Sequence, residues 1–207
     1  MAFQCPEWSQ PESDSKLPSV ALGMAEVVRF LEKRSGTLII NHGEIRNWHS
    51  KIFKNAVPLS YYAGNYRCDN LARPCLGQNV TVNSHPGTDF HLVETEMQAY
   101  SGNLYSFVGQ TDAYMRLESS FAKRITAILR LASWGVGRFH QIHPFLNGNG
   151  RISRLLANYF FIRYDLSFVP FKTIARPHGD YVTAMDACMS GNFVALFQYF
   201  VLLHASQ

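Results

Sequence analysis

The chain has 207 residues, of which 47% are apolar and 16% charged, with a formal net charge of +4 at pH 7. This length and balance are typical of one soluble globular domain, and no stretch has the eighteen or so uncharged apolar residues that would cross a membrane. Because the nineteen lysines and arginines are scattered along the chain, the sequence favours neither a nucleic-acid partner nor a membrane partner.

The N-terminal region is polar and contains three prolines. Residues 1–18 are therefore predicted to be a loosely ordered arm, and 19–207 a single domain. The arm lacks the basic and apolar parts of a secretory signal, so we expect a cytoplasmic protein, with specialised secretion as an effector left open. Ser19 can cap a first helix over 19–34, which Gly36 would end. Its apolar face consists of Val20, Met24, Val27, Val28 and Leu31.

The next segments predict a second helix and a small hairpin. Asn41, followed three residues later by Glu44, resembles a capping box for a helix over 43–53. An irregular section dense in turn formers follows. Residues 78–83 read QNVTVN, a short β-type alternation that ends at the turn-prone SHPG.

The rest of the chain is predicted to be helical. Asp89 can cap a helix over 89–100, and helical sequence resumes at Thr111, with breaks expected near Gly135 and Gly137. A further break is expected at residues 147–150. The last helices are predicted over 152–164 and 178–204, the second interrupted at Gly191. The fold class that follows is mostly α, with one hairpin.

The four cysteines are Cys5, Cys68, Cys75 and Cys188. No two of them form a CxxC motif, so the sequence supports neither a zinc site nor a dithiol redox motif. We expect reduced, mostly packed thiols.

Residues 143–154 read HPFLNGNGRISR and combine several features of an anion site. Gly148 and Gly150 allow positive φ and a close backbone approach, so that successive amides can form an anion-binding nest at the start of a helix. Arg151 and Arg154 lie one helical turn apart and can grip phosphate oxygens. His143 can serve as a general base beside a bound phosphate. A helix–turn–helix corner with a packed histidine and solvated arginines is the structural alternative.

This stretch resembles the signature of the Fic domain family, His-x-Phe-x-(Asp/Glu)-Gly-Asn-Gly-Arg-x-x-Arg. The resemblance extends to AGNYR at 63–67, which is similar to the family's Gly-x-Tyr-Arg segment, and to QNVTVNSHPG, which falls where the family has its flap hairpin. It covers a core of about 40–204. The resemblance implies a Fic-type helical bundle with a β-hairpin flap near the active site.

The resemblance also implies an activity, the transfer of AMP from ATP to a Ser, Thr or Tyr hydroxyl of a target protein. His143 would remove the proton from that hydroxyl. Gly148, Asn149 and Gly150 would stabilise charge on the α-phosphate, and Arg151 and Arg154 would hold the other two phosphates. Phe145 would pack beneath the loop, Tyr181 would line the adenine pocket, and the flap residues Val80, Thr81 and Val82 would hold the target as an added strand.

The acidic position of the signature is Asn147 in this chain. The family's carboxylate helps hold a Mg²⁺ (or Mn²⁺) ion that bridges phosphates, whereas an amide oxygen brings no charge, so we expect weaker metal binding. Slower AMP transfer, a different group transfer, and nucleotide binding without turnover by an interaction module stay open.

Two further expectations concern regulation and a second histidine. None of the eight glutamates is followed by Gly or Asn, as the family's inhibitory helix motif requires. We therefore expect no glutamate, including Glu26 or Glu32 of the first helix, to block the γ-phosphate site, and a separate inhibitory partner remains an option. His140 forms an HxxH with His143, but without a third ligand it is expected to be a packed residue.

Overall fold

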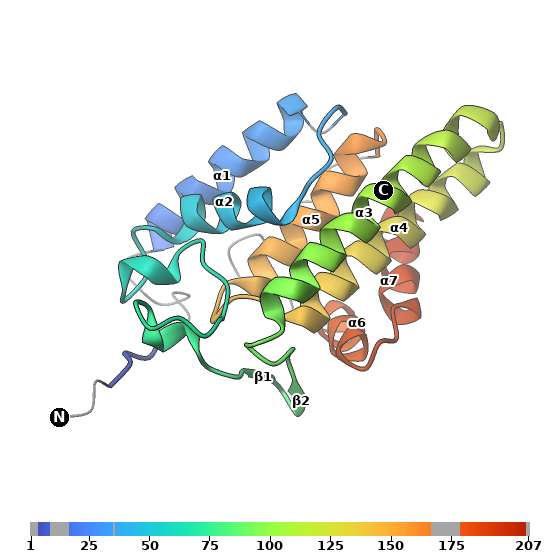
Figure 1. The fold of residues 1–207 in the computed structure, drawn as a ribbon. Coiled ribbons are helices and arrows are strands. Elements are labelled where there is room, and N and C mark those ends of the chain that lie inside the picture. Colours follow the sequence, from blue (N-terminus) through green and yellow to red (C-terminus); the bar gives the residue numbers. More distant parts are fainter. Residues whose placement is uncertain (1–3, 9–16, 35, 167–178, 206–207) are drawn as a thin grey trace.

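The computed structural model describes residues 4–8, 17–34, 36–166 and 179–205. Over these residues it is a bundle of α-helices with one two-stranded hairpin (Figure 1), so the predicted fold class is confirmed. The helices are α1 (Leu17–Arg34), α2 (His42–Phe53), α3 (Val93–Leu117), α4 (Phe121–Ile142), α5 (Asn149–Arg163), α6 (Asp180–Met189) and α7 (Val194–Ala205). Short 3₁₀ turns are η2 (Ser60–Tyr62) and η3 (Pro74–Leu76), and the strands are β1 (Thr81–Val82) and β2 (His85–Pro86).

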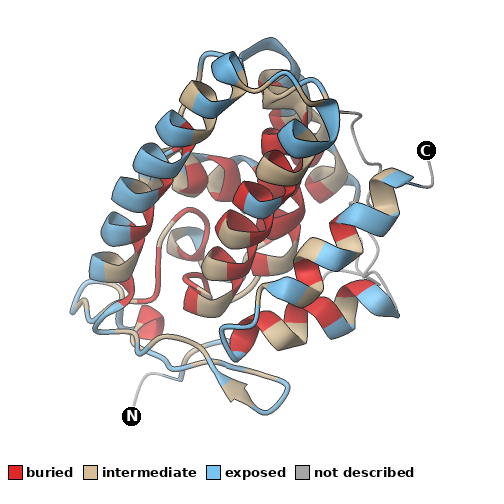
Figure 2. Ribbon diagram, turned by 90° about the vertical axis from the view of Figure 1, so that its right-hand side faces the viewer, coloured by how far each residue is buried: buried red, intermediate tan, exposed pale blue. Residues whose placement is uncertain are grey.

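Helix α5 lies at the centre of the bundle. Each of its residues from Arg151 to Phe161 is buried, and a helix that is buried on every side needs neighbours all round. It packs along α4 and also meets α1 and α2, while α6 and α7 pack against α4. Figure 2 shows buried residues concentrated where the helices face one another. The neighbouring helices therefore surround the start of α5, which carries the second half of the motif at residues 143–154.

Helix α4 continues through Gly135 and Gly137, so the break expected there is wrong. The two glycines instead allow close packing. A Cβ on Gly135 would lie 2.6 Å from Cζ of Phe160, and one on Gly137 would lie 2.5 Å from Cδ1 of Phe193. The glycines thus provide space for aromatic rings of α5 and of the α6–α7 connection rather than a chain break.

Helix α3 is one continuous helix of 25 residues from Val93 to Leu117, which corrects the expected start at Asp89 and the expected gap before Thr111. Asp89 does not cap it. Its carboxylate accepts hydrogen bonds from the N–H of His91 at 2.9 Å and from Nδ2 of Asn79 at 3.1 Å. This local Asx turn holds the residues that follow the hairpin, so the helix begins one turn later.

Other predicted elements are confirmed with small shifts. Helix α1 begins two residues before Ser19, which lies in its first turn, and Gly191 separates α6 from α7 with φ of +79°. The expected start of that region at residue 178 lies outside the described residues. The hairpin pairs Thr81 with Pro86 and Val82 with His85.

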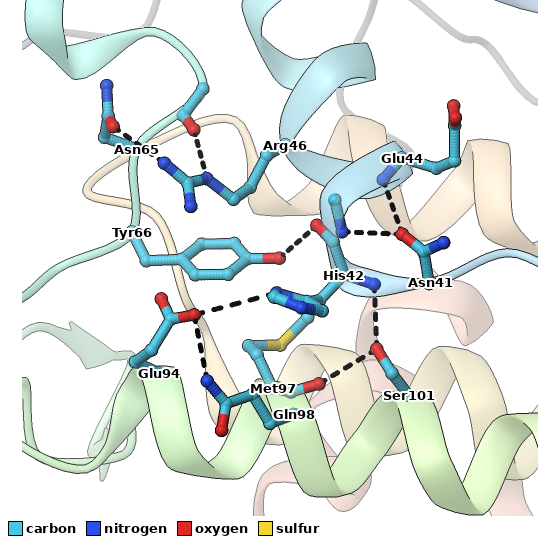
Figure 3. A network of polar contacts seen from close by, with 12 residues as sticks. Asn41, His42, Glu44, Arg46, Asn65, Tyr66, Glu94, Met97, Gln98 and Ser101 are labelled. Carbon is cyan, nitrogen blue, oxygen red and sulfur yellow. Dashed lines mark hydrogen bonds and ion pairs between the residues drawn. The ribbon is translucent and has the colours of Figure 1, made fainter.

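The start of α2 joins three parts of the fold (Figure 3). The side chain of Asn41 accepts from the N–H groups of Gly43 and Glu44, as the predicted cap requires. The hydroxyl of Tyr66 donates to the carbonyl of His42 at 2.8 Å, and the N–H of His42 donates to Oγ of Ser101 on α3 at 2.7 Å. These bonds fix the segment around Tyr66, which leads directly into Arg67.

Cys5 and Cys75 form a disulfide with a Cα–Cα distance of 5.5 Å. The expectation of reduced thiols is therefore wrong for these two residues, although Cys68 and Cys188 are free. Spacing along the chain could not reveal a pair that is 70 residues apart in sequence. Residues 4–8, the described part of the predicted arm, lie against the fold through this bond, and Trp8 packs on the main core.

Candidate active site

A pocket of ≈ 470 Å³ lies between the hairpin, the loop that joins α4 to α5, and α6. This volume is within the range of small-molecule sites. The structure brings every site residue expected from the sequence to this pocket: Val80, Thr81, Val82, His143, Asn147, Gly148, Asn149, Gly150, Arg151, Arg154 and Tyr181 all line it. Asn83, the last residue of the expected flap segment 78–83, lines it as well. The lining also includes residues that were not expected there: His140, Leu146, Val182, Met185 and Asp186.

His143 ends α4 in a left-handed conformation, with φ of +51° and ψ of +59°. Its Nδ1 lies 3.3 Å from the carbonyl oxygen of His140. Because a carbonyl can only accept, Nδ1 carries the proton and Nε2 keeps its lone pair. Burial lowers the pKa of His143 from 6.5 to about 3, and the neighbouring His140 adds to this effect. The imidazole is therefore neutral at pH 7.

Gly148 caps the start of α5 with φ of +83°. A Cβ at this position would overlap the ring of Phe53, so both the backbone conformation and the space require glycine. Its carbonyl accepts from the N–H groups of Arg151 and Ile152. The N–H groups of Asn149 and Gly150 open the helix and have no acceptor among the described residues, so they form the positive end of α5 at the pocket.

The side chain of Asn149 supports the loop from within. It is 1% exposed, accepts from the N–H of Phe145 at 3.0 Å and donates to the carbonyl of Phe145 at 2.8 Å. The contribution that Asn149 can make to a phosphate therefore comes from its main-chain N–H.

His49 also supports this loop, a role that no motif in the sequence had indicated. Its ring is fully buried and stacks on Phe145 with centroids 3.7 Å apart. Nδ1 accepts from the N–H of Gly64 at 2.9 Å, so Nε2 carries the proton and donates to the carbonyl of Asn147 at 3.0 Å. Burial lowers the pKa of His49 to about 3, which keeps this neutral bridge intact near pH 7.

Arg151 and Arg154 are nearly buried, with exposures of 3% and 5%, and both face the pocket. The guanidinium of Arg151 lies over the ring of Phe53 at 5.9 Å. Burial raises the pKa of Tyr181 on α6, and the charge of Arg154 beside it partly offsets that rise. Two cations thus flank the end of the pocket where α5 and α6 converge.

The guanidinium of Arg67 binds four main-chain carbonyls near the pocket. Arg67 is 0% exposed, and its guanidinium donates to the carbonyls of His143 (3.0 Å), Gln78 (3.1 Å), Thr88 (2.6 Å) and Ile142 (3.2 Å). Burial lowers its pKa to about 10, so it stays charged at pH 7. One cation therefore fixes both ends of the hairpin to the main chain of His143. The AGNYR segment was the signal in the sequence, although no role had been assigned to its arginine.

The tip of the hairpin is tied to α6. Nδ2 of Asn83 donates to Oδ1 of Asp186 at 2.7 Å, and Nε2 of His85 lies 3.6 Å from Oδ2 of the same carboxylate. The hairpin is thus held at its base by Arg67 and at its tip by Asp186, with β1 along the pocket between them.

His140 is buried at 8% exposure, as expected, but it lines the pocket as well. Burial lowers its pKa to about 4, against the opposing effect of Asp186. The described residues contain no group of three or more His, Cys, Asp or Glu side chains that could hold a metal ion.

Asn147 is a poor match for a divalent cation. Its Oδ1 accepts from the N–H of Gly148 at 2.6 Å, and its Nδ2 donates to the carbonyl of Trp8 at 2.9 Å. The side chain is uncharged and both of its polar atoms are engaged, whereas Mg²⁺ favours carboxylate oxygens.

Glu26 and Glu32 are exposed on α1, and within the described part of the chain no ion pair joins either of them to Arg154.

Comparison with known proteins identifies related sequences. A family model described as the Fic/DOC family matches residues 39–161. A Fido domain-containing protein of Dictyostelium discoideum is 38% identical over 56 residues, which cover 27% of this chain and 37% of that relative. The match to this relative thus spans little more than a third of its length.

Two solved structures are similar to the fold. The BepC protein of Bartonella tribocorum, a VirB-translocated effector with bound AMPPNP, aligns with a TM-score of 0.59 at 15% identity, over 92% of this chain and 85% of that one. A Fic domain containing signaling protein of Bacteroides thetaiotaomicron aligns with a TM-score of 0.58 at 17% identity, over 98% of this chain and 73% of that one. At these identities the two structures support the fold alone. Among the described helices, none combines the length and apolar character needed to cross a membrane.

Proposed function

The chain belongs to the Fic/DOC family, and on that premise we propose that its pocket transfers AMP from ATP to a Ser, Thr or Tyr hydroxyl of a target protein. The observation that carries the proposal is the pairing of a neutral His143 with the amide-rich start of α5 in one pocket. The BepC neighbour was crystallised with AMPPNP, an ATP analogue, which supports a nucleotide as the ligand. We also propose that residues 19–207 form a single catalytic domain.

His143 is the proposed general base. Nε2 accepts the proton of the target hydroxyl while the hydroxyl oxygen forms a bond to the α-phosphorus. The bond from the α-phosphorus to the oxygen that bridges to the β-phosphate breaks, and pyrophosphate leaves with that electron pair. The negative charge of a bound triphosphate raises the pKa of the nearby imidazole and so makes it a stronger base than in the empty pocket.

The start of α5 is the proposed phosphate site. The N–H groups of Asn149 and Gly150 and the positive end of the helix would stabilise charge on the α-phosphate oxygens as it develops. Arg151 and Arg154 would neutralise the β- and γ-phosphates, which also stabilises the departing pyrophosphate. Tyr181 would line the site of the adenine ring.

The hairpin is the proposed docking site for the target. Strand β1 with Val80, Thr81 and Val82 lines the pocket, and its free edge could pair with an extended target segment. Such pairing would position the hydroxyl next to Nε2 of His143. When Mg²⁺ or Mn²⁺ accompanies ATP, the ion would screen the charges of the phosphates. Asn147 does not fit as a ligand of that ion.

Replacement of His143 by alanine tests this function. The wild-type protein, incubated with ATP and cell lysate, should add AMP to a protein, seen by mass spectrometry as one added adenylate. We expect His143→Ala to lower this transfer by at least about a hundredfold because the general base is lost, while ATP still binds. His91→Ala, which removes an exposed imidazole outside the pocket, is the control.

Other products would indicate the alternative functions. An added phosphate would identify a phosphoryl transferase on the same fold, and ATP binding without any covalent product would identify a nucleotide-binding interaction module. Transfer that persists in His143→Ala would exclude His143 as the base.

A further inference from the structure

We propose that Asn147 is a positioning residue that binds residues 5–8, called here the N-terminal strap, against residues 143–148, the phosphate loop between α4 and α5. This contact orders the phosphate loop for ATP. The inference rests on the proposed function for its ligand. The strap and its bond to Asn147 stand on contacts of their own.

The side chain of Asn147 bridges the strap and the start of α5. Its Nδ2 donates to the carbonyl of Trp8 at 2.9 Å, and its Oδ1 accepts from the N–H of Gly148 at 2.6 Å. The amide supplies both the donor and the acceptor that these bonds need. A carboxylate has no proton to donate, so aspartate at this position would place a negative oxygen against the carbonyl of Trp8.

Trp8 packs on the residues that support the loop from below. Its ring meets His49 edge-on at 5.8 Å and Phe53 at 5.4 Å. His49 donates to the carbonyl of Asn147, and Phe53 occupies the space that a side chain at Gly148 would need. The strap thus contacts the loop directly through Asn147 and indirectly through its two supporting rings.

Two further bonds fix the strap along its length. Cys5 is joined to Cys75 by the disulfide, and the hydroxyl of Tyr62 donates to the carbonyl of Pro6 at 3.3 Å. The disulfide anchors the chain three residues before Trp8, and this short tether raises the effective concentration of Trp8 at the loop. The amide of Asn147 and the disulfide of Cys5 therefore both hold the strap against the phosphate loop, one at each end of the strap.

Hydrogen exchange and ATP binding in EDTA test the proposal on the full chain. The variants are Asn147→Asp, Asn147→Ala, Cys5→Ser and the double variant Asn147→Asp/Cys5→Ser. Cys68→Ser is the matched control, because it replaces a free, half-buried thiol. Exchange is followed in peptides that contain residues 5–8 and 145–150, and the Kd for ATP by calorimetry.

We expect faster exchange in both peptides for each variant, and a Kd for ATP raised about fivefold, the effect of one lost hydrogen bond. The double variant should be no weaker than the worse single variant, because both changes release the same contact. Where transfer is measurable, the KM for ATP should rise with little change in the KM for the target. Cys68→Ser should behave as wild type.

Dithiothreitol provides a second route if Cys5→Ser does not fold. It delivers two electrons and two protons to the S–S bond, which gives two thiols and cyclic oxidised dithiothreitol, and exchange should again rise in both peptides.

Unchanged exchange in residues 5–8 of Asn147→Asp would overturn the bond to Trp8. Tighter ATP binding in that variant without metal, or a released strap with an unchanged loop, would overturn the positioning role. Failure of the wild type to bind ATP would overturn the proposed function, while exchange would still decide whether Asn147 holds the strap.

Discussion

Several side chains around the pocket have no proposed contact with substrate and instead hold those that do. Arg67 binds the main chain of His143, His49 binds the carbonyl of Asn147, and Asn149 closes the loop onto Phe145. All three are at most 1% exposed and find their partners inside the protein. A site organised in this way loses little conformational entropy on ligand binding, because its loop is already restrained.

Arg67 gives the sharpest prediction at the scale of single residues. Arg67→Met should lower the free energy of unfolding by about 3 kcal/mol, since four carbonyls lose their donor, the one of Ile142 in a buried position. Arg67→Lys should lose less, because an ammonium keeps a charge and three donors. Urea unfolding measures the effect.

The exposed Arg29 on α1 is the control for this measurement, and Arg29→Met should stay within about 0.5 kcal/mol of wild type. A small effect of Arg67→Met, equal to that of the control, would show that water replaces the guanidinium at those carbonyls.

At the scale of elements, the pocket depends on where two helices start and end. Helix α4 ends at Ile142 and is capped by the left-handed His143, and α5 starts six residues after His143 with its first amides at the pocket. The hairpin covers this junction and bonds to α6 through Asp186. Its position is thus decided by contacts at its two ends, since its strands have only two residues each.

Asp186→Ala should loosen the hairpin without unfolding the bundle. Loss of its bonds to Asn83 and His85 should speed amide exchange at residues 80–86 by about two- to tenfold, the effect of roughly 0.5–1.5 kcal/mol. The KM for the target should rise more than the KM for ATP, because the hairpin is the proposed target site. Asp180→Ala, which removes an exposed carboxylate from the start of the same helix, should leave hairpin exchange unchanged. Equal exchange in the two variants would contradict the role of Asp186.

For the protein as a whole, two buried histidines and the half-buried His143 make the fold sensitive to acid. Burial lowers the pKa values of His49, His140 and His143 to about 3, about 4 and about 3. Their ordinary value in the unfolded chain is near 6.5. The unfolded chain therefore binds more protons than the folded one below pH 6.5, and stability is lost as the pH falls from there towards 3.

Because stability is lost as the histidines bind protons in the unfolded chain, the melting temperature should be nearly constant above pH 7 and should fall between pH 6.5 and 4. Each histidine contributes up to about 1.4 kcal/mol per pH unit to the decrease in the free energy of unfolding. His140→Gln should make the fall shallower, and His91→Gln, which removes an exposed imidazole, should not. Calorimetric melting across this range measures the slope. A flat profile in the wild type would show that these histidines accept protons in the folded state.

The residues of the proposed phosphate site could be identified from the sequence because they are local. Gly148, Gly150, Arg151 and Arg154 lie within one loop and one helical turn, where backbone geometry relates neighbours directly. Apolar periodicity identified α1, a capping pattern identified α2, and a β-type alternation identified the hairpin. The break expected at Gly135 and Gly137 was wrong, because a glycine that ends a helix and one that admits a neighbouring ring look the same in a single chain.

Contacts that join distant segments became visible only once the helices were packed together. Arg67 meets carbonyls 11 to 76 residues away, Asn147 meets Trp8 across 139 residues, and Cys5 meets Cys75 across 70. Such contacts depend on how whole helices pack, which residue spacing does not encode. Residue patterns were therefore sufficient for the family and the fold class and located the proposed phosphate loop, because these rest on neighbouring residues. The contacts that hold this loop, among them the bond of Asn147 to Trp8, follow from the packing around α5.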